Sequence, residues 1–234
     1  MAGIKTGIDG QINNNIQTLN MGCYFDASIN KSFTPGDTSM YNLASGSLTP
    51  TGSLLNDIGF HGPLTASWVF DGVDDEVKYD EYTTGQAFTI AWWAKLPNLG
   101  SGASYILNKG GSNNIMYNSN EILYVEASNT TSYIVTNDSG VPNVFDNTWH
   151  YFVMTKPSDT ADAMKFYFDN EGPFDALGSM AAVSTFSFTH LMHFDAGSQP
   201  YAAGSIANLM VYNRRLSTGD ILQNYNAQKD RFGL

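Results

Sequence analysis

Short hydrophobic segments recur along the chain from Trp68 to Tyr212, about one every 8 to 15 residues, and in Phe88–Lys95 a wholly apolar set of residues alternates with a mixed one. Alternation with a period of two is typical of strands that bury one face. Short strands at this spacing are typical of β-sandwiches and jelly rolls. The predicted strands are Trp68–Phe70, Glu76–Tyr79, Phe88–Lys95, Ser104–Asn108, Ile115–Tyr117, Ile122–Ala127, Ser132–Thr136, Trp149–Lys156, Met164–Phe168, Phe186–Thr189, Leu191–Phe194 and Ser205–Tyr212. We therefore predict an all-β fold, a jelly-roll β-sandwich of two antiparallel sheets with one short C-terminal helix.

Two of the longest predicted strands, Phe88–Lys95 and Trp149–Lys156, carry three aromatic residues each. In Phe88–Lys95, the alternate residues that we expect to face the core are Phe88, Ile90, Trp92 and Ala94. In Trp149–Lys156, both faces are apolar. A strand of that kind is covered on both sides or borders an aromatic groove.

The C-terminal helix is predicted to begin after Leu216. Ser217 is a good N-cap residue, and Asp220 three positions later completes a pattern like a capping box. Ile221, Leu222 and Tyr225 then form a short apolar stripe. We expect this stripe to lie against the sandwich.

The segments between the strands are rich in turn residues. Asp71-Gly72 stands between two predicted strands, and glycine readily adopts the positive φ that a tight hairpin turn needs. From about residue 26 to about residue 66 the chain is rich in Gly, Ser, Thr and Pro, which predicts coil. Residues 1–20 are polar and rich in Asn and Gln, so we predict an N-terminal arm or edge strand there. We assign residues 21–234 to one domain.

The charge and composition of the chain limit the kinds of molecule that it is expected to bind. Twenty-two acidic residues against eleven basic ones give a net charge of −11, and such a surface repels nucleic acid. The single cysteine, Cys23, excludes an internal disulfide. The N-terminal region lacks an apolar stretch of signal-peptide length, and no segment approaches about 18 apolar residues. We expect no signal peptide, no membrane partner and no nucleic-acid partner.

Several sequence strings follow the order in which a known module carries them. They are Tyr24–Ala27, Val69–Asp75, Phe88–Lys95, Ile106–Gly110, Asn147–Thr155, Met164–Asp169 and Ser205–Ser217. Over about residues 22 to 226, the chain therefore resembles the laminin-G-like, concanavalin-A-like lectin and glucanase superfamily of jelly rolls. The resemblance implies a laminin-G-like jelly-roll domain over residues 21–234.

The opening half most resembles versions of the module carried in bacteriophage structural proteins. In those versions a tryptophan commonly precedes an Asp-Leu-Ser turn, whereas this chain has Met40-Tyr41-Asn42-Leu43-Ala44-Ser45. The resemblance implies a non-catalytic structural or decoration protein of the virion, associated with the capsid or tail and made in the host cytoplasm. Its partners would be other virion proteins, and it could form a homo-oligomer. Two alternatives stay open: a carbohydrate-binding module for adhesion to host glycans, and an adhesive protein-interaction module of a cell.

Catalysis is not predicted. Glycoside hydrolases of the same fold class place Glu-x-Asp-x-Glu on one strand, and none of the five glutamates here lies in that pattern. His190 and His193 have the spacing of a ligand pair on a helix. On a predicted strand, however, residues i and i+3 diverge, which favours ordinary histidines. We therefore expect the protein not to be an enzyme.

Two sets of residues are candidates for binding. Sugar rings stack on flat aromatic faces, and the candidate carbohydrate-binding residues are Trp93, Trp149, Tyr151, Tyr117 and Tyr124. Hard cations take several carboxylate oxygens, and the candidate metal ligands, for Ca²⁺ as the one cofactor considered, are Asp71, Asp74, Asp75 and Glu76. The alternative for each aromatic residue is core packing, and for the acidic loop a solvated turn.

Overall fold

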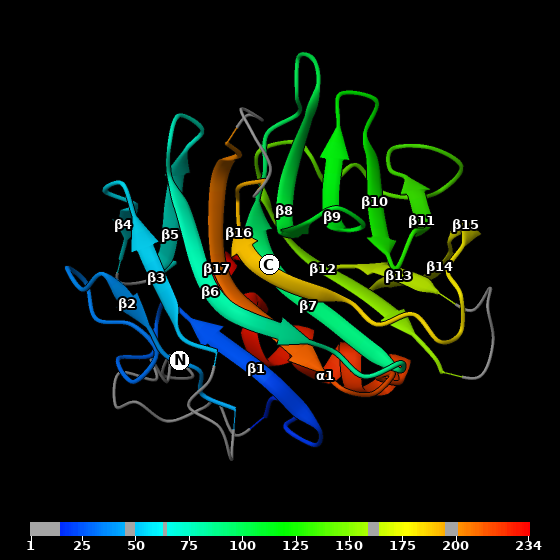
Figure 1. Cartoon of the computed structure of the whole chain (residues 1–234), viewed down its shortest axis with the longest axis horizontal. Coiled ribbons are helices and arrows are strands. Elements are labelled where there is room, and N and C mark those ends of the chain that lie inside the picture. Colours follow the sequence, from blue (N-terminus) through cyan, green and yellow to red (C-terminus); the bar gives the residue numbers. More distant parts are fainter. Residues whose placement is uncertain (1–14, 45–49, 63–64, 159–163, 195–200) are drawn as a thin grey trace.

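The computed structural model describes residues 15–44, 50–62, 65–158, 164–194 and 201–234. In this part of the chain, two antiparallel sheets stack on each other, and one short helix lies near the C-terminus (Figure 1). The predicted fold class, an all-β sandwich of the jelly-roll kind with a C-terminal helix, is confirmed. We call the two layers sheet A and sheet B.

Sheet A has eight strands. They are β1 (Met21–Asp26), β4 (Gly59–His61), β5 (Ser67–Asp71), β7 (Phe88–Lys95), β12 (Trp149–Lys156), β13 (Lys165–Phe168), β14 (Glu171–Asp175) and β17 (Ala203–Tyr212). Their order across the sheet is β14-β13-β12-β7-β17-β5-β4, with β1 also paired to β17.

Sheet B has nine strands. They are β2 (Ser39–Met40), β3 (Gly52–Leu55), β6 (Glu76–Thr83), β8 (Ala103–Gly110), β9 (Asn113–Asn118), β10 (Ile122–Ala127), β11 (Thr130–Val135), β15 (Leu177–Ser179) and β16 (Ser187–Leu191). Their order is β15-β11-β10-β9-β8-β16-β6-β3-β2, and β8 to β11 lie side by side in Figure 1.

The sequence missed the short strands and one turn. β2, β3 and β4 lie within the segment predicted as coil, and β14 and β15 were not predicted. Asp71-Gly72 does not close a hairpin, because β5 belongs to sheet A and β6 to sheet B. Gly72 does have the expected positive φ, 80°. The turn therefore carries the chain from one layer to the other.

The main core lies between the two sheets. The four residues predicted to face it, Phe88, Ile90, Trp92 and Ala94, all do so. Trp92 stacks on Phe152 of the neighbouring strand β12, with ring centroids 5.2 Å apart and planes 2° apart. Cys23 is buried in the same core. Burial of this much aromatic surface is the dominant stabilising term of the fold.

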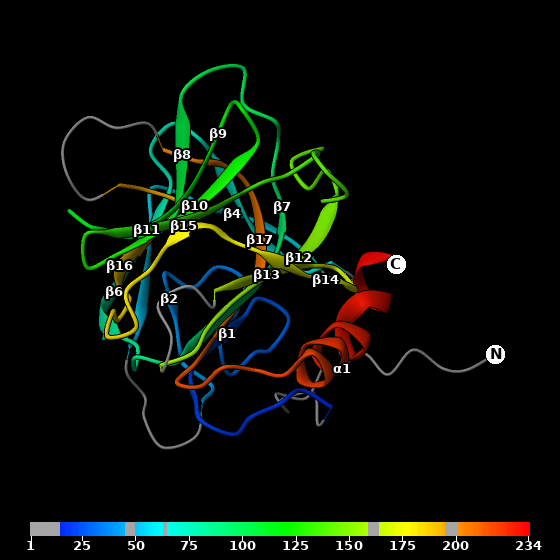
Figure 2. The same cartoon turned by 90° about the vertical axis from the view of Figure 1, so that its right-hand side faces the viewer.

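A second core lies on the outer face of sheet A, under α1 (Thr218–Gln228) and the 3-10 helix η1 (Lys229–Phe232) (Figure 2). Trp93 of β7 stacks on Phe232 at 4.2 Å and on Tyr225 at 5.7 Å between ring centroids. The apolar outer face of β12, with Tyr151 and Val153, belongs to the same cluster. Of the two alternatives predicted for this strand, cover on both sides is therefore the one observed, and β12 does not border an open aromatic groove at Tyr151 and Val153.

The helix is capped as predicted. The Ser217 hydroxyl accepts a hydrogen bond from the Asp220 amide, and the Asp220 carboxylate accepts one from the Ser217 amide. Ile221 and Tyr225 are buried, whereas Leu222 is 44% exposed, so the predicted stripe is wrong at Leu222. No helix within the described residues has the length and apolar character needed to cross a membrane.

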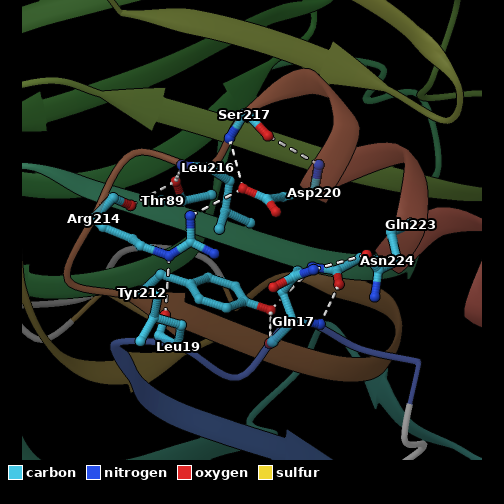
Figure 3. A network of polar contacts seen from close by, with 10 residues as sticks. All are labelled: Gln17, Leu19, Thr89, Tyr212, Arg214, Leu216, Ser217, Asp220, Gln223 and Asn224. Carbon is cyan, nitrogen blue, oxygen red and sulfur yellow. Dashed lines mark hydrogen bonds and ion pairs between the residues drawn. The ribbon is translucent and has the colours of Figure 1, made fainter.

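The described end of the arm, residues 15–20, lies against α1 and contains no strand. Figure 3 shows how it is held. The Gln17 amide donates to Asn224 Oδ1 at 2.8 Å, and the Gln17 carbonyl accepts from the Tyr212 hydroxyl at 3.0 Å. Arg214 bridges the Leu19 carbonyl and the Asp220 carboxylate. The remaining arm residues, 1–14, lie outside the described part of the chain.

Candidate functional site

The outer face of sheet B bears half-buried side chains on four neighbouring strands. On β10, Leu123, Val125 and Ala127 point into the main core. The residues between them, Tyr124 and Glu126, point to the other side of the sheet and are half-buried. In the described residues no helix lies over this face, whereas α1 covers the outer face of sheet A.

Aromatic and apolar residues of this face form one row across the four strands. The pairing sets Tyr105 of β8 opposite Met116 of β9, Met116 opposite Tyr124, and Tyr124 opposite Tyr133 of β11. We call these four residues the tyrosine row. The rings of Tyr124 and Tyr133 are 5.6 Å apart between centroids, and all four side chains are half-buried. Neighbouring strands lie about 4.8 Å apart, so the row is a continuous ridge in which the Met116 side chain stands between the rings of Tyr105 and Tyr124.

A second row runs beside the first. Asn108 of β8 pairs with Asn114 of β9, and Asn114 pairs with Glu126 of β10. We call these three residues the polar row. Asn114 and Glu126 lie two residues along their strands from the tyrosine row, and Asn108 lies three residues along because the register of β8 shifts between Tyr105 and Leu107. Asn114 Nδ2 donates to Glu126 Oε2 at 2.8 Å, and Asn108 Nδ2 donates to Asn114 Oδ1 at 2.6 Å. Two buried amides therefore hold one half-buried carboxylate in a fixed orientation.

The electrostatics of the face keep the Tyr105 phenol neutral. Burial raises the pKa of Tyr105, and the nearby Glu126 carboxylate raises it further. At neutral pH the Tyr105 hydroxyl is therefore a hydrogen-bond donor. The Tyr124 hydroxyl accepts from Asn118 Nδ2 at 3.2 Å. The face thus offers aromatic rings for stacking and, beside them, the half-buried Glu126 carboxylate, which the buried Asn114 amide orients.

Three of the five predicted sugar-stacking residues are buried, which corrects that part of the prediction. Trp93, Tyr151 and Tyr117 are each 0% exposed. Trp93 and Tyr151 lie beneath α1 and η1, and Tyr117 stacks on Phe145 in the main core at 4.4 Å. None of the three has an open ring face.

The other two predicted residues are partly exposed. Trp149 is half-buried beside Phe232, with ring centroids 4.8 Å apart, at the rim of the second core. Tyr124 belongs to the tyrosine row. The sequence interpretation missed Tyr105, Tyr133 and Glu126. The signal was present in the hairpin, because the two-residue turn Ser128-Asn129, with φ of 52° and 63°, sets Tyr124 opposite Tyr133.

The predicted acidic metal site divides into two parts. Asp71, Asp74 and Asp75 keep carboxylate oxygens within 4.8 Å of one another, whereas Glu76 groups with His190 and His193. Two carboxylates of the loop also accept hydrogen bonds from backbone amides of the turn. Asp75 Oδ2 accepts from the Asp71 amide at 2.9 Å, and Asp71 Oδ1 accepts from the Val73 amide at 2.7 Å. Calcium binding by this loop stays a prediction, and Glu76 is no part of the loop cluster.

Sequence comparison identifies the family of the chain. The model of the concanavalin A-like lectin/glucanases superfamily of the laminin G type matches residues 71–222. A search of curated protein sequences finds no match.

Solved structures show the same architecture. A mutant of Trypanosoma rangeli sialidase displaying trans-sialidase activity matches with a TM-score of 0.61 and 13% identity, over 94% of this chain and 34% of the sialidase chain. The receptor binding domain of botulinum neurotoxin D matches with a TM-score of 0.63 and 12% identity, over 93% of this chain and 54% of that chain. Botulinum neurotoxin type C, whose cell entry is dependent upon interaction with two ganglioside molecules, matches with a TM-score of 0.63 and 13% identity, over 90% and 51%. The chain thus spans about a third to a half of these proteins, and the likeness shows a shared fold.

Proposed function

The chain belongs to the concanavalin A-like lectin/glucanases superfamily, and on that premise we propose that it is a non-catalytic glycan-binding protein whose ligand lies on the outer face of sheet B. The proposal rests on one observation: the tyrosine row and the polar row lie next to each other on the same face of sheet B. Sugar rings offer apolar C–H faces and a rim of hydroxyl groups, and a binding surface needs partners for both. The solved structures with this fold include proteins that interact with gangliosides or act on sialic acid derivatives.

Charge favours neutral glycans over sialylated ones for this chain. The polar row ends in the Glu126 carboxylate, and the whole chain carries a net charge of −11. An anionic sugar would have to approach both against electrostatic repulsion. A carboxylate also accepts hydrogen bonds from neutral hydroxyl groups, and charged acceptors make the stronger bonds.

The proposal of binding without catalysis is supported by the positions of the glutamates. Glu126 is hydrogen-bonded to Asn114, Glu81 pairs with Lys109, and Glu76 pairs with His193. A glycosidase needs two carboxyl groups facing one bond at about 5 to 10 Å. Among the described residues, the carboxylate cluster of Asp71, Asp74 and Asp75 lies in the loop that joins the two sheets and is not part of the tyrosine row.

The experiment is a titration of purified protein with an array of neutral and sialylated glycans, followed by calorimetry on the best binder. Tyr124→Ala and Tyr133→Ala remove one ring each, and each is expected to weaken binding up to about tenfold, because an aromatic contact of this kind contributes about 0.5–1.5 kcal/mol. Glu126→Gln is expected to weaken binding of neutral glycans by a similar factor.

Tyr41→Ala is the matched control, because Tyr41 is an exposed tyrosine next to β2, away from β8 to β11. Its binding should equal that of the wild type. The proposal is wrong if no glycan binds, or if the Tyr124, Tyr133 and Tyr41 variants bind equally well.

We also propose that the glycan-binding protein is a structural or decoration component of a phage particle. The support is the resemblance of the opening half to phage-borne modules, together with one contact. Asn42 stands where those modules have an aspartate, and its Oδ1 accepts from the Tyr24 and Ala44 amides at 2.9 Å each. An aspartate carboxylate could accept the same two bonds, so the departure from the pattern preserves the turn.

The test of this second proposal is independent of glycans. Particles purified from a phage that encodes the chain should contain it in stoichiometric amounts by mass spectrometry, together with capsid or tail proteins. Its absence from particles, or a gene neighbourhood without capsid, portal or tail genes, would favour the adhesive module of a cell instead.

A further inference from the structure

We propose that Glu76, His190 and His193 together bind one divalent transition-metal ion, with Zn²⁺ as the best-fitting ion. Glu76 begins β6, His190 lies in the neighbouring strand β16, and His193 follows the end of β16. One ligand atom from each side chain lies within 4.8 Å of the others. None of the three residues belongs to the tyrosine row or the polar row, but His190 pairs with Asn108 of the polar row, so the metal site lies beside the proposed glycan site. The metal proposal does not depend on glycan binding.

The backbone explains how two histidines three residues apart reach the same side of the sheet. Met192 has a left-handed φ of 65°, and both Leu191 and Met192 are buried in the main core. Two consecutive side chains therefore point inward, and His190 and His193 both point outward. The expectation that the histidines diverge on a strand is wrong for this reason, since a regular strand alternates and this one ends in a left-handed turn.

The distances are close to those of a tetrahedral site. His193 Nδ1 lies 2.7 Å from Glu76 Oε2, and His190 Nε2 lies 3.7 Å from the same oxygen. Ligand bonds of 2.0–2.1 Å to zinc place neighbouring ligand atoms about 3.3 Å apart. Since all three ligand atoms already lie within 4.8 Å of one another, a shift of about 1 Å or less in each side chain would complete the coordination.

The surroundings restrict the side chains as a metal site requires. The side chains of Glu76, His190 and His193 are only 14%, 5% and 14% exposed. His190 Nδ1 lies 2.9 Å from the Thr189 hydroxyl, which can accept its proton and leave Nε2 as the ligand atom. The His193 ring stacks on Tyr201 at 4.2 Å between centroids, with planes 13° apart.

The donor set selects the ion. Two imidazole nitrogens and one carboxylate suit Zn²⁺ and its transition-metal neighbours, whereas Ca²⁺ and Mg²⁺ prefer oxygen donors alone. Three protein ligands leave a fourth position for water or another ligand atom. The oxygen-only cluster of Asp71, Asp74 and Asp75 should therefore not compete strongly for the same ion.

The experiment uses tag-free, metal-stripped full-length chain, titrated with Zn²⁺ by calorimetry and followed by thermal unfolding. We expect one Zn²⁺ per chain and, at a hundredfold excess over Kd, a rise in Tm of about 5 °C or more. His193→Gln and Glu76→Gln should each lower the affinity at least about 100-fold, and Thr189→Val about tenfold. His190→Gln tests the most buried ligand.

His61→Gln is the matched control, because it removes an exposed histidine from β4 of the other sheet. It should bind Zn²⁺ as the wild type does. Each variant is first melted without metal, and if His190→Gln is unfolded, the His193 and Glu76 variants decide the outcome. Absence of Zn²⁺ binding by the wild type, or undiminished binding by the folded His193 and Glu76 variants, would overturn the proposal.

Discussion

The outer faces of the two sheets carry similar residues but differ in what covers them. On sheet A, Trp93 and Tyr151 are completely buried beneath α1 and η1. On sheet B, Tyr124 and Tyr133 are half-buried, and within the described residues no helix lies over them. Aromatic composition alone therefore does not distinguish a binding surface from a second core. The difference comes from α1, which follows the last strand, β17, and covers the outer face of sheet A.

Replacing Trp93 with alanine should give the largest loss of stability, because the ring stacks on Tyr151, Tyr225 and Phe232 at once. Truncation of a buried aromatic residue costs about 3–5 kcal/mol. Chemical denaturation should show a corresponding fall in the free energy of unfolding. Tyr124→Ala is the comparison, since a half-exposed residue should cost about 1 kcal/mol or less. Equal losses in the two variants would contradict the distinction between the faces.

Deletion of residues 1–20 should give the next largest effect. It removes Ile16, which is buried in the second core, and the two hydrogen bonds of the Gln17 backbone. One buried aliphatic side chain and two hydrogen bonds together stabilise by about 2–4 kcal/mol. The sandwich should nevertheless melt in one cooperative transition, because its main core lies between the sheets. Loss of that transition would show that the arm is integral to the domain.

The long strands and the helix could be predicted from the sequence, whereas the shortest strands could not. The long aromatic and β-branched strands β7, β10 and β12 were predicted with their observed bounds, and the helix was predicted with its observed start and cap. β2, β3 and β4 were missed because strands of two to four residues in a Gly- and Ser-rich segment have too few positions to show a period. Their pairing is set by tertiary contacts with β6 and β5.

The candidate sites were harder to predict because they depend on which strands become neighbours. Tyr124 opposite Tyr133 follows from a local turn, but Tyr105 and Met116 join the row only through sheet order. The grouping of Glu76 with His190 spans more than 100 residues of sequence and depends on the left-handed Met192. A strand pattern does not reveal an irregular backbone conformation of this kind.

Ser217→Ala should lower the free energy of unfolding by less, and it measures how much the N-cap contributes to holding α1 on sheet A. The hydroxyl of Ser217 accepts from the Asp220 amide at 3.1 Å, and its loss should cost about 1 kcal/mol. That is a fraction of the Trp93→Ala effect, because stacking on sheet A contributes more to α1 than its own cap does. Ser217→Thr keeps an acceptor oxygen and should unfold nearly as the wild type. A loss as large as that of Trp93→Ala would show that the cap dominates.

The smallest effect is expected at the rim of sheet A, where His150 of β12 lies between two carboxylates. Nδ1 is 2.7 Å from Asp169 and Nε2 is 3.1 Å from Asp146. Burial opposes protonation, but hydrogen bonds and charge from Asp169 and Asp146 outweigh it and raise the pKa of His150 above its ordinary value.

Because the pKa is raised in the folded state, the stabilisation by His150 is complete below about pH 6.5 and is lost as the pH rises through the folded-state pKa. The difference in unfolding free energy between the wild type and His150→Gln should therefore shrink as the pH is raised from about 6 into the alkaline range. Urea unfolding across this range measures it, with His61→Gln as the control for an exposed histidine. A difference that stays constant or grows with pH would show that the two carboxylates do not stabilise the protonated ring, and that the rim of sheet A is held by packing alone.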